Sequence, residues 1–120
     1  MLMLQGIALS SSLFDSENEN HIINRKNLRG QTPLYVAAQN GNINILSYLI
    51  KRGANPYILS DVDYHNKESI IDVSCRWSHY SALQFLLVNV KWKVSFLAQA
   101  AKLCGSKEMK NMLKKVKPLT

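Results

Sequence analysis

The side chains that could serve as nucleophiles or general bases are three histidines and two cysteines: His21, His65, His79, Cys75 and Cys104. Nucleophilic catalysis needs such a group beside a base that a third residue orients. None of the five falls into a recognisable catalytic motif. The sequence also has no glycine-rich phosphate loop and no pairing of His and carboxylate at a zinc-like spacing. We therefore expect no enzymatic activity and no cofactor.

One stretch superficially resembles a calcium-binding loop. DVDYHNKESIID, residues 61 to 72, has Asp61, Asp63 and His65 at alternate positions and Asp72 at its end. Such a loop needs a glycine where Asn66 stands, and its last ligand is normally a glutamate. The repeat register described below also places Asp72 on a helix. We expect no metal site here.

The composition fits one compact domain. The chain has 120 residues, 47% of them hydrophobic, and no apolar run approaches the roughly 18 residues of a membrane-spanning helix. The first 24 residues hold no basic residue, so no targeting segment is expected. Two cysteines without a CxxC pair favour a reducing, cytoplasmic setting, which is compatible with attachment to the cytoskeleton or a large complex.

The charge of the chain is uneven. The formal net charge is +7, and residues 91 to 120 hold eight lysines against Glu108 alone, so the excess is C-terminal. Such asymmetry is typical of a protein that meets an acidic partner, either an acidic protein surface or RNA. The alternative is a lysine-rich terminal helix that is simply solvated.

A helix pair is predicted within NLRGQTPLYVAAQNGNINILSYLIKRGANP, residues 27 to 56. Gly30 permits a tight turn, Thr32 is a good N-cap, and Pro33 suits the first helical position. Gly41 breaks the chain, and apolar residues then recur at helical spacing up to Gly53. The expected core of this pair is Leu34, Ala37, Ala38, Ile43, Leu46, Leu49 and Ile50.

This segment resembles a complete ankyrin repeat, a unit of about 33 residues. A shift of 37 residues finds a second copy at 67 to 87, with Ser69 on Thr32 and Cys75 on Ala38. That copy has Lys67 in place of the turn glycine and Ser78 in place of the glycine between the helices. Residues 96 to 116 read as a weaker third helix pair, and VNVKWKV before it is too short for the usual hairpin finger.

The resemblance implies an all-α ankyrin-repeat solenoid of about three and a half helix-pair units with short hairpin fingers. We expect a single domain over residues 1–120, divided into a partial N-terminal cap at 1–26, repeats at 27–59 and 60–90, and a degenerate repeat at 91–117. The segment 23–27 resembles a strand that leads into a finger. The cap would contain one helix with the apolar residues Ile7, Leu9, Leu13 and Phe14.

The resemblance also implies where a protein partner binds. Ankyrin proteins usually bind through a concave face made of finger tips and exposed positions of the inner helices. Carried over by position, these residues are Leu28, Arg29, Gln31, Gln39, Asn40, His65, Asn66, Glu68, Arg76 and Trp77. Trp and Arg dominate interface energetics most often, which singles out Arg76 and Trp77. Packing beside Ser78 is the alternative role for Trp77, while His79 and Cys75 are expected to be structural.

A second candidate surface is the last helix, where lysines recur at spacings of three and four opposite an apolar face. The lysines are Lys107, Lys110, Lys114 and Lys117. They favourably oppose the helix dipole and keep the terminal repeat soluble, which is a sufficient structural reason for them. The sequence therefore predicts a non-catalytic adaptor or structural subunit that binds a protein. Docking on RNA or an acidic filament through the lysines is the alternative, and no membrane contact is expected.

Overall fold

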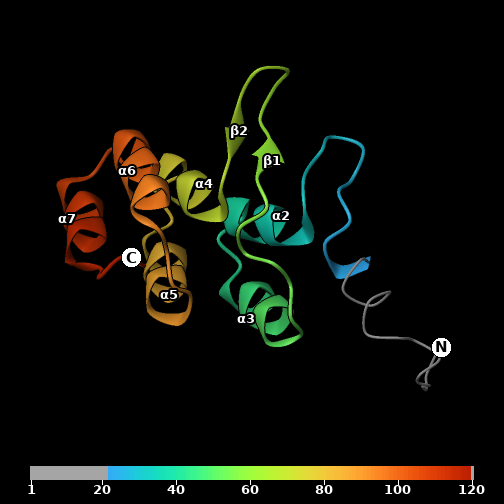
Figure 1. Cartoon of the computed structure of the whole chain (residues 1–120), viewed down its shortest axis with the longest axis horizontal. Helices are drawn as coiled ribbons and strands as arrows, with labels where there is room; N and C mark the ends of the chain where they lie inside the picture. The colour runs from blue at the N-terminus through green and yellow to red at the C-terminus, as the bar shows by residue number, and fades with distance from the viewer. Residues whose placement is uncertain (1–21, 120) are drawn as a thin grey trace.

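The computed structural model describes residues 22–119 and shows helices stacked in pairs (Figure 1). The elements are α2 (Pro33–Gln39), α3 (Ile43–Lys51), β1 (Ser60–Asp61), β2 (Lys67–Glu68), α4 (Ile70–Arg76), α5 (Tyr80–Asn89), α6 (Val94–Leu103) and α7 (Lys107–Lys115). Helices α2, α4 and α6 form one layer and α3, α5 and α7 the other, with the β1–β2 finger rising beside α2 and α4. The predicted all-α ankyrin solenoid is confirmed.

The signals read from the first repeat act as predicted. The Thr32 side chain accepts a hydrogen bond from the Tyr35 amide, and Pro33 occupies the first turn of α2. Gly41 adopts φ of +67°, where only glycine is unstrained, and Asn42 then caps α3. Two helices broken at Gly41 follow directly from these local preferences.

The second repeat is capped in another way. Ser69 and Asp72 form a capping box, in which the Ser69 hydroxyl accepts from the Asp72 amide and the Asp72 carboxylate accepts from the Ser69 amide. Ser78 takes the left-handed conformation of the missing glycine, with φ of +57°. Its neighbour His79 donates through Nε2 to the Gln39 carbonyl 2.8 Å away, so the predicted structural role of His79 is confirmed.

No finger separates the second and third helix pairs, as the short VNVKWKV segment predicts. Only four residues link α5 to α6, and Trp92 among them is fully buried. Its indole N–H donates to the Leu86 carbonyl, and its ring packs against Tyr57 and Phe96 with centroids 5.4 Å from each. An aromatic cluster thus fills space at the crossing between the two repeats.

The core follows the repeat pattern, but part of the predicted core of the first helix pair is only half-buried. Leu46 and Cys75 are almost fully buried. Ile43, Leu49 and Ile50 are half-buried, and Leu49 faces a groove on the N-terminal side of α2 and α3. Cys104 is buried too. Burial raises the pKa of the Cys75 thiol, and the neighbouring Cys104 raises it further, as expected for an unreactive core cysteine.

The predicted strand at 23–27 is wrong. Ile23 is helical, Asn24 forms a turn, and residues 25–27 belong to neither a helix nor a strand. The Asn27 side chain accepts hydrogen bonds from the backbone amides of Arg29 and Gln31 and closes a tight loop there. The expected cap helix at Ile7, Leu9, Leu13 and Phe14 lies outside the described residues. Within residues 22–119, no helix has the length and apolar character needed to cross a membrane.

Candidate functional site

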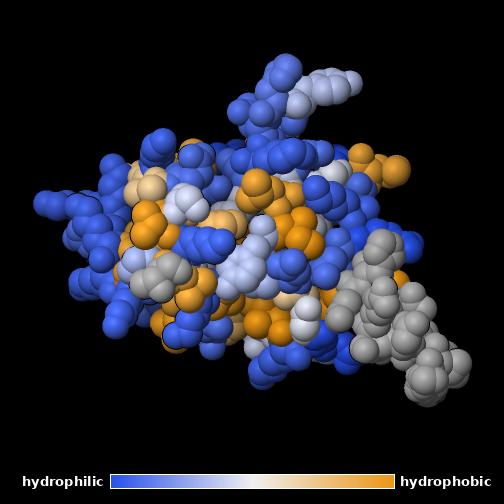
Figure 2. Space-filling view, in the orientation of Figure 1, coloured by the Kyte–Doolittle hydropathy of each residue, from blue (hydrophilic) through white to orange (hydrophobic). Residues whose placement is uncertain are grey.

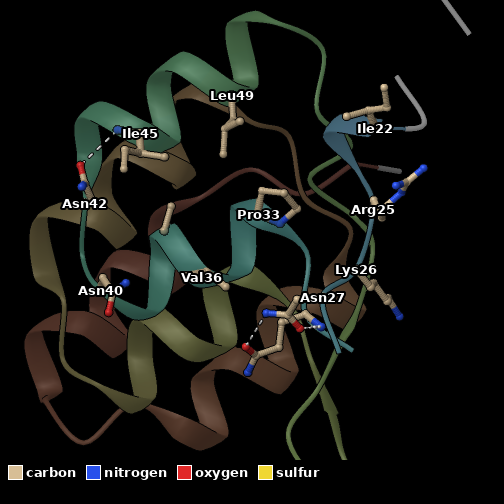
Figure 3. Close-up of a pocket in the computed structure, with 12 residues that line it drawn as sticks. Ile22, Arg25, Lys26, Asn27, Pro33, Val36, Asn40, Asn42, Ile45 and Leu49 are labelled. Carbon is tan, nitrogen blue, oxygen red and sulfur yellow. Dashed lines mark hydrogen bonds between the residues drawn. The ribbon is translucent and has the colours of Figure 1, made fainter. Parts of the chain in front are cut away.

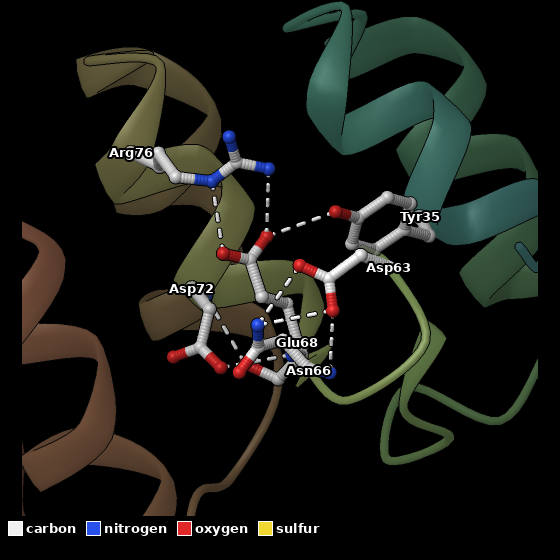
Figure 4. Close-up of polar contacts among 7 residues, drawn as sticks. Tyr35, Asp63, Asn66, Glu68, Asp72 and Arg76 are labelled. Carbon is white, nitrogen blue, oxygen red and sulfur yellow. Dashed lines mark hydrogen bonds and ion pairs between the residues drawn. The ribbon is translucent and has the colours of Figure 1, made fainter. Parts of the chain in front are cut away.

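A buried carboxylate joins the first two repeats (Figure 4). Glu68, on β2, is only 6% exposed. Its Oε1 accepts from the Tyr35 hydroxyl at 2.9 Å, and the Arg76 guanidinium donates to both carboxylate oxygens at 2.8 and 3.1 Å. Burial and the Glu68 carboxylate raise the pKa of Tyr35 to about 12. A finger residue is thereby fixed to helices α2 and α4.

The same network orients Arg76 against an exposed tryptophan. Trp77, the C-cap of α4, is 53% exposed, and the Arg76 guanidinium lies 5.5 Å from the centroid of its ring. A cation held over an aromatic face is favourable in itself. Because Glu68 holds Arg76 in place, little side-chain entropy remains to be lost when a partner contacts this pair. Trp77 does not fill the core beside Ser78.

The tip of the finger is organised by Asp63. Its carboxylate accepts hydrogen bonds from the backbone amides of His65 and Asn66 and from the Asn66 side chain. These hydrogen bonds lower the pKa of Asp63, and the Asn66 side chain is the largest cause. His65 and Asn66 are exposed, as expected for a tip. Among residues 22–119, no group of three or more His, Cys, Asp or Glu could hold a metal ion.

The concave-face residues predicted from sequence are mostly accessible, with one correction. Leu28 and Arg29 are exposed in the turn before α2, and Asn40 is exposed at the end of that helix. Gln31 and Gln39 are half-buried. Glu68 is not an exposed contact residue, because the Tyr35 hydroxyl and Arg76 need its carboxylate inside the protein.

Tyr35 was absent from the predicted set although it holds the network together. Its sequence signal is weak, since a tyrosine three residues after the N-cap is also an ordinary inner-helix residue. Only the folded chain brings its hydroxyl to a carboxylate 33 residues further on.

The lysine-rich end also matches the prediction with one difference. Lys107, Lys110 and Lys114 are exposed on α7, whereas Met109 and Leu113 on its opposite side are buried. Lys117 is exposed but lies beyond the helix, which ends at Lys115. Figure 2 shows hydrophilic side chains over this end of the molecule.

An apolar groove of about 580 Å³ lies on the N-terminal side of α2 and α3 (Figure 3). Val36, Ala37, Ile45 and Leu49 contribute from the helices, and Ile22 approaches from the preceding segment. α4 and α5 cover the other side of this helix pair. The groove thus lies at the N-terminal end of the helix pairs that the structure describes, on the side away from α4 and α5.

Comparison with known proteins agrees with this architecture. The model for ankyrin repeats (3 copies) matches residues 7–96, which is more than half of the chain. No curated protein sequence matches. Ankyrin repeats are generally protein–protein interaction modules and are typically non-catalytic. The paired helices, the finger and the family match together show that this chain belongs to the ankyrin-repeat family.

Proposed function

We propose that this protein is a non-catalytic adaptor or structural subunit that holds a partner protein on its concave face, with Arg76 and Trp77 at the centre of the contact. The single observation that carries this proposal is the exposed Trp77 ring beneath an Arg76 side chain already fixed by Glu68. Exposed Trp and Arg that need little ordering are the residues that most often dominate binding energy. A cytoplasmic location accords with the cysteine usage.

The test uses a partner captured with the full chain from native extract and then purified. Trp77→Ala should weaken its affinity at least about 30-fold, which corresponds to about 2 kcal/mol. Tyr48→Ala is the matched control, because Tyr48 is an exposed aromatic on α3 with Arg52 5.4 Å from its ring centroid. It lies in the other helix layer and should change affinity little. Equal effects of the two substitutions would count against the concave face.

The alternative is docking of an acidic surface, RNA or a filament on the exposed lysines of α7. The separation of Lys107, Lys110 and Lys114 from the apolar side of that helix favours it. Replacing these three lysines by Gln should then abolish binding, and affinity for RNA should fall steeply as salt rises. If the triple variant binds as wild type while Trp77→Ala does not, the alternative is excluded.

A further inference from the structure

The finger that is missing between the second and third repeats leaves a groove beside β2. The finger that is present shows how a finger joins its neighbour: the Asp61 amide donates to the Gly30 carbonyl, and the Ser60 hydroxyl accepts from the Thr32 amide. By the 37-residue shift, Lys67 and Ser69 are the counterparts of Gly30 and Thr32. No later finger reaches them, since only four residues lie between the end of α5 and the start of α6.

The residues at the two equivalent positions, Gly30 and Lys67, agree with the absence of a second finger. A side chain at Gly30 would collide with the Asp61 carboxylate of the adjoining finger. Lys67 can replace glycine in the second repeat because no finger packs there. We call the hollow at this place the β2 groove; it measures about 410 Å³. It is lined by Leu59, His65, Asn66, Lys67, Ser69, Asp72, Ser95, Phe96 and Gln99.

The edge of β2 can accept another strand. Asp61 and Lys67 are opposite each other in the antiparallel hairpin. The Asp61 amide points out of the hairpin and donates to the Gly30 carbonyl. Asp61 and Lys67 are therefore a non-hydrogen-bonded pair of the antiparallel ladder. Lys67 must therefore direct its own N–H and C=O outward on the other edge. No residue of the described chain outside the hairpin pairs with them.

The floor of the groove holds an unused acceptor. Asp72 is 3% exposed, and its Oδ2 accepts a hydrogen bond from the Ser69 amide. This oxygen replaces the serine hydroxyl that a finger would supply, as Ser60 does for the Thr32 amide. Its Oδ1 is buried without a hydrogen-bond partner. In Figure 4 one oxygen of Asp72 points away from the Glu68 network. A buried acceptor left without a donor costs free energy that a ligand's donor can recover.

The local charge indicates the chemistry of that donor. Four of the five acidic residues in the described chain are Asp61, Asp63, Glu68 and Asp72, all within twelve residues. Lys67 and Arg76 already form ion pairs with Asp61 and Glu68, and Lys26 also lies close enough to Asp61 to lower its pKa. The region around the groove is thus acidic in a protein of net charge +7. A cationic ligand group fits it.

We infer that the β2 groove binds an extended segment of a partner protein, which adds to the free edge of β2 and places a lysine or arginine side chain at Asp72. Main-chain hydrogen bonds to Lys67 would supply affinity, and the Asp72 carboxylate would select the basic residue. This inference rests on the proposed function only in that a protein is bound, because the groove does not include Arg76 or Trp77.

The probe is a capped five-residue peptide of alternating Val and Thr with a central Arg, and its control carries Gln at the centre. Amide chemical shifts of the isotope-labelled full chain are followed up to about 2 mM peptide, a range suited to weak binding. We expect shifts at Lys67, Ser69 and Gln99, and about tenfold weaker binding of the Gln peptide. Absence of shifts with the Arg peptide would overturn the inference and leave a water molecule as the partner of Asp72.

Variants test separately the role of Asp72 in selecting a basic residue and the role of the Lys67 backbone in binding the strand. Asp72→Asn keeps an acceptor for the Ser69 amide and should bind both peptides equally; a persisting preference for Arg would overturn the role of Asp72. Lys67→Pro removes the outward N–H and should abolish binding, whereas Lys67→Ala keeps that N–H and should retain it. Circular dichroism checks that each variant folds. Trp77→Ala should leave peptide binding unchanged, so loss there would assign the peptide to the concave face.

Discussion

Glu68→Ala tests whether the finger is fixed to the helices by a buried charge. The substitution removes three hydrogen bonds and leaves the Tyr35 hydroxyl inside the protein without an acceptor. A hydrogen bond to a charged group contributes about 1.5–3 kcal/mol, and an orphaned buried donor costs about 1–3 kcal/mol. Arg76 is about one third exposed, so water replaces part of what it loses. We expect the free energy of unfolding to fall by about 2–4 kcal/mol.

Urea unfolding at pH 7, followed by circular dichroism, measures this loss. Glu108→Ala is the control, because Glu108 is an exposed acid on α7 for which no ion pair is found in the described chain. It should change stability by less than about 1 kcal/mol. Tyr35→Phe should cost about 1.5 kcal/mol alone and very little in the Glu68→Ala background, since the hydrogen bond is already gone. A Glu68→Ala effect no larger than that of Glu108→Ala would refute the network as a stabilising contact.

Two further predictions concern the helix pairs. Ser78→Gly should raise the free energy of unfolding by about 0.5–1 kcal/mol in the same urea assay, because Ser78 has a positive φ that glycine adopts without strain; a destabilising effect would contradict that reasoning. Leu46→Ala should cost about 2–5 kcal/mol, and Leu49→Ala clearly less, because Leu46 is fully buried and Leu49 lines an open groove. Equal losses at the two leucines would show that the groove is covered in solution.

Local signals allowed the helix pairs to be predicted. Thr32, Pro33 and Gly41 fix where α2 begins and ends, since an N-cap, a first-turn proline and a positive φ act within a few residues. The loss of the finger between the second and third helix pairs was also predictable, because too few residues connect α5 to α6 for a hairpin. The positions of Arg76 and Trp77 followed from the repeat register, and both are exposed.

The register did not reveal which polar groups pair across repeats. Glu68 occupies a position that the family exposes, yet here it is buried, because Tyr35 and Arg76 converge on it from two helices. Nothing within a few residues of Glu68 signals that contact, since Tyr35 lies 33 residues before it.

The sequence by itself determined the repeat fold, the helix ends and the lysine-rich last helix, because caps, glycines and apolar spacing act locally along the chain. Only the tertiary structure decided that Trp92 is core while Trp77 is surface, and that Asp72 keeps an oxygen without a donor. These outcomes depend on what packs against each residue from a neighbouring repeat. No finger of the third repeat packs against β2, and the space left there is the β2 groove.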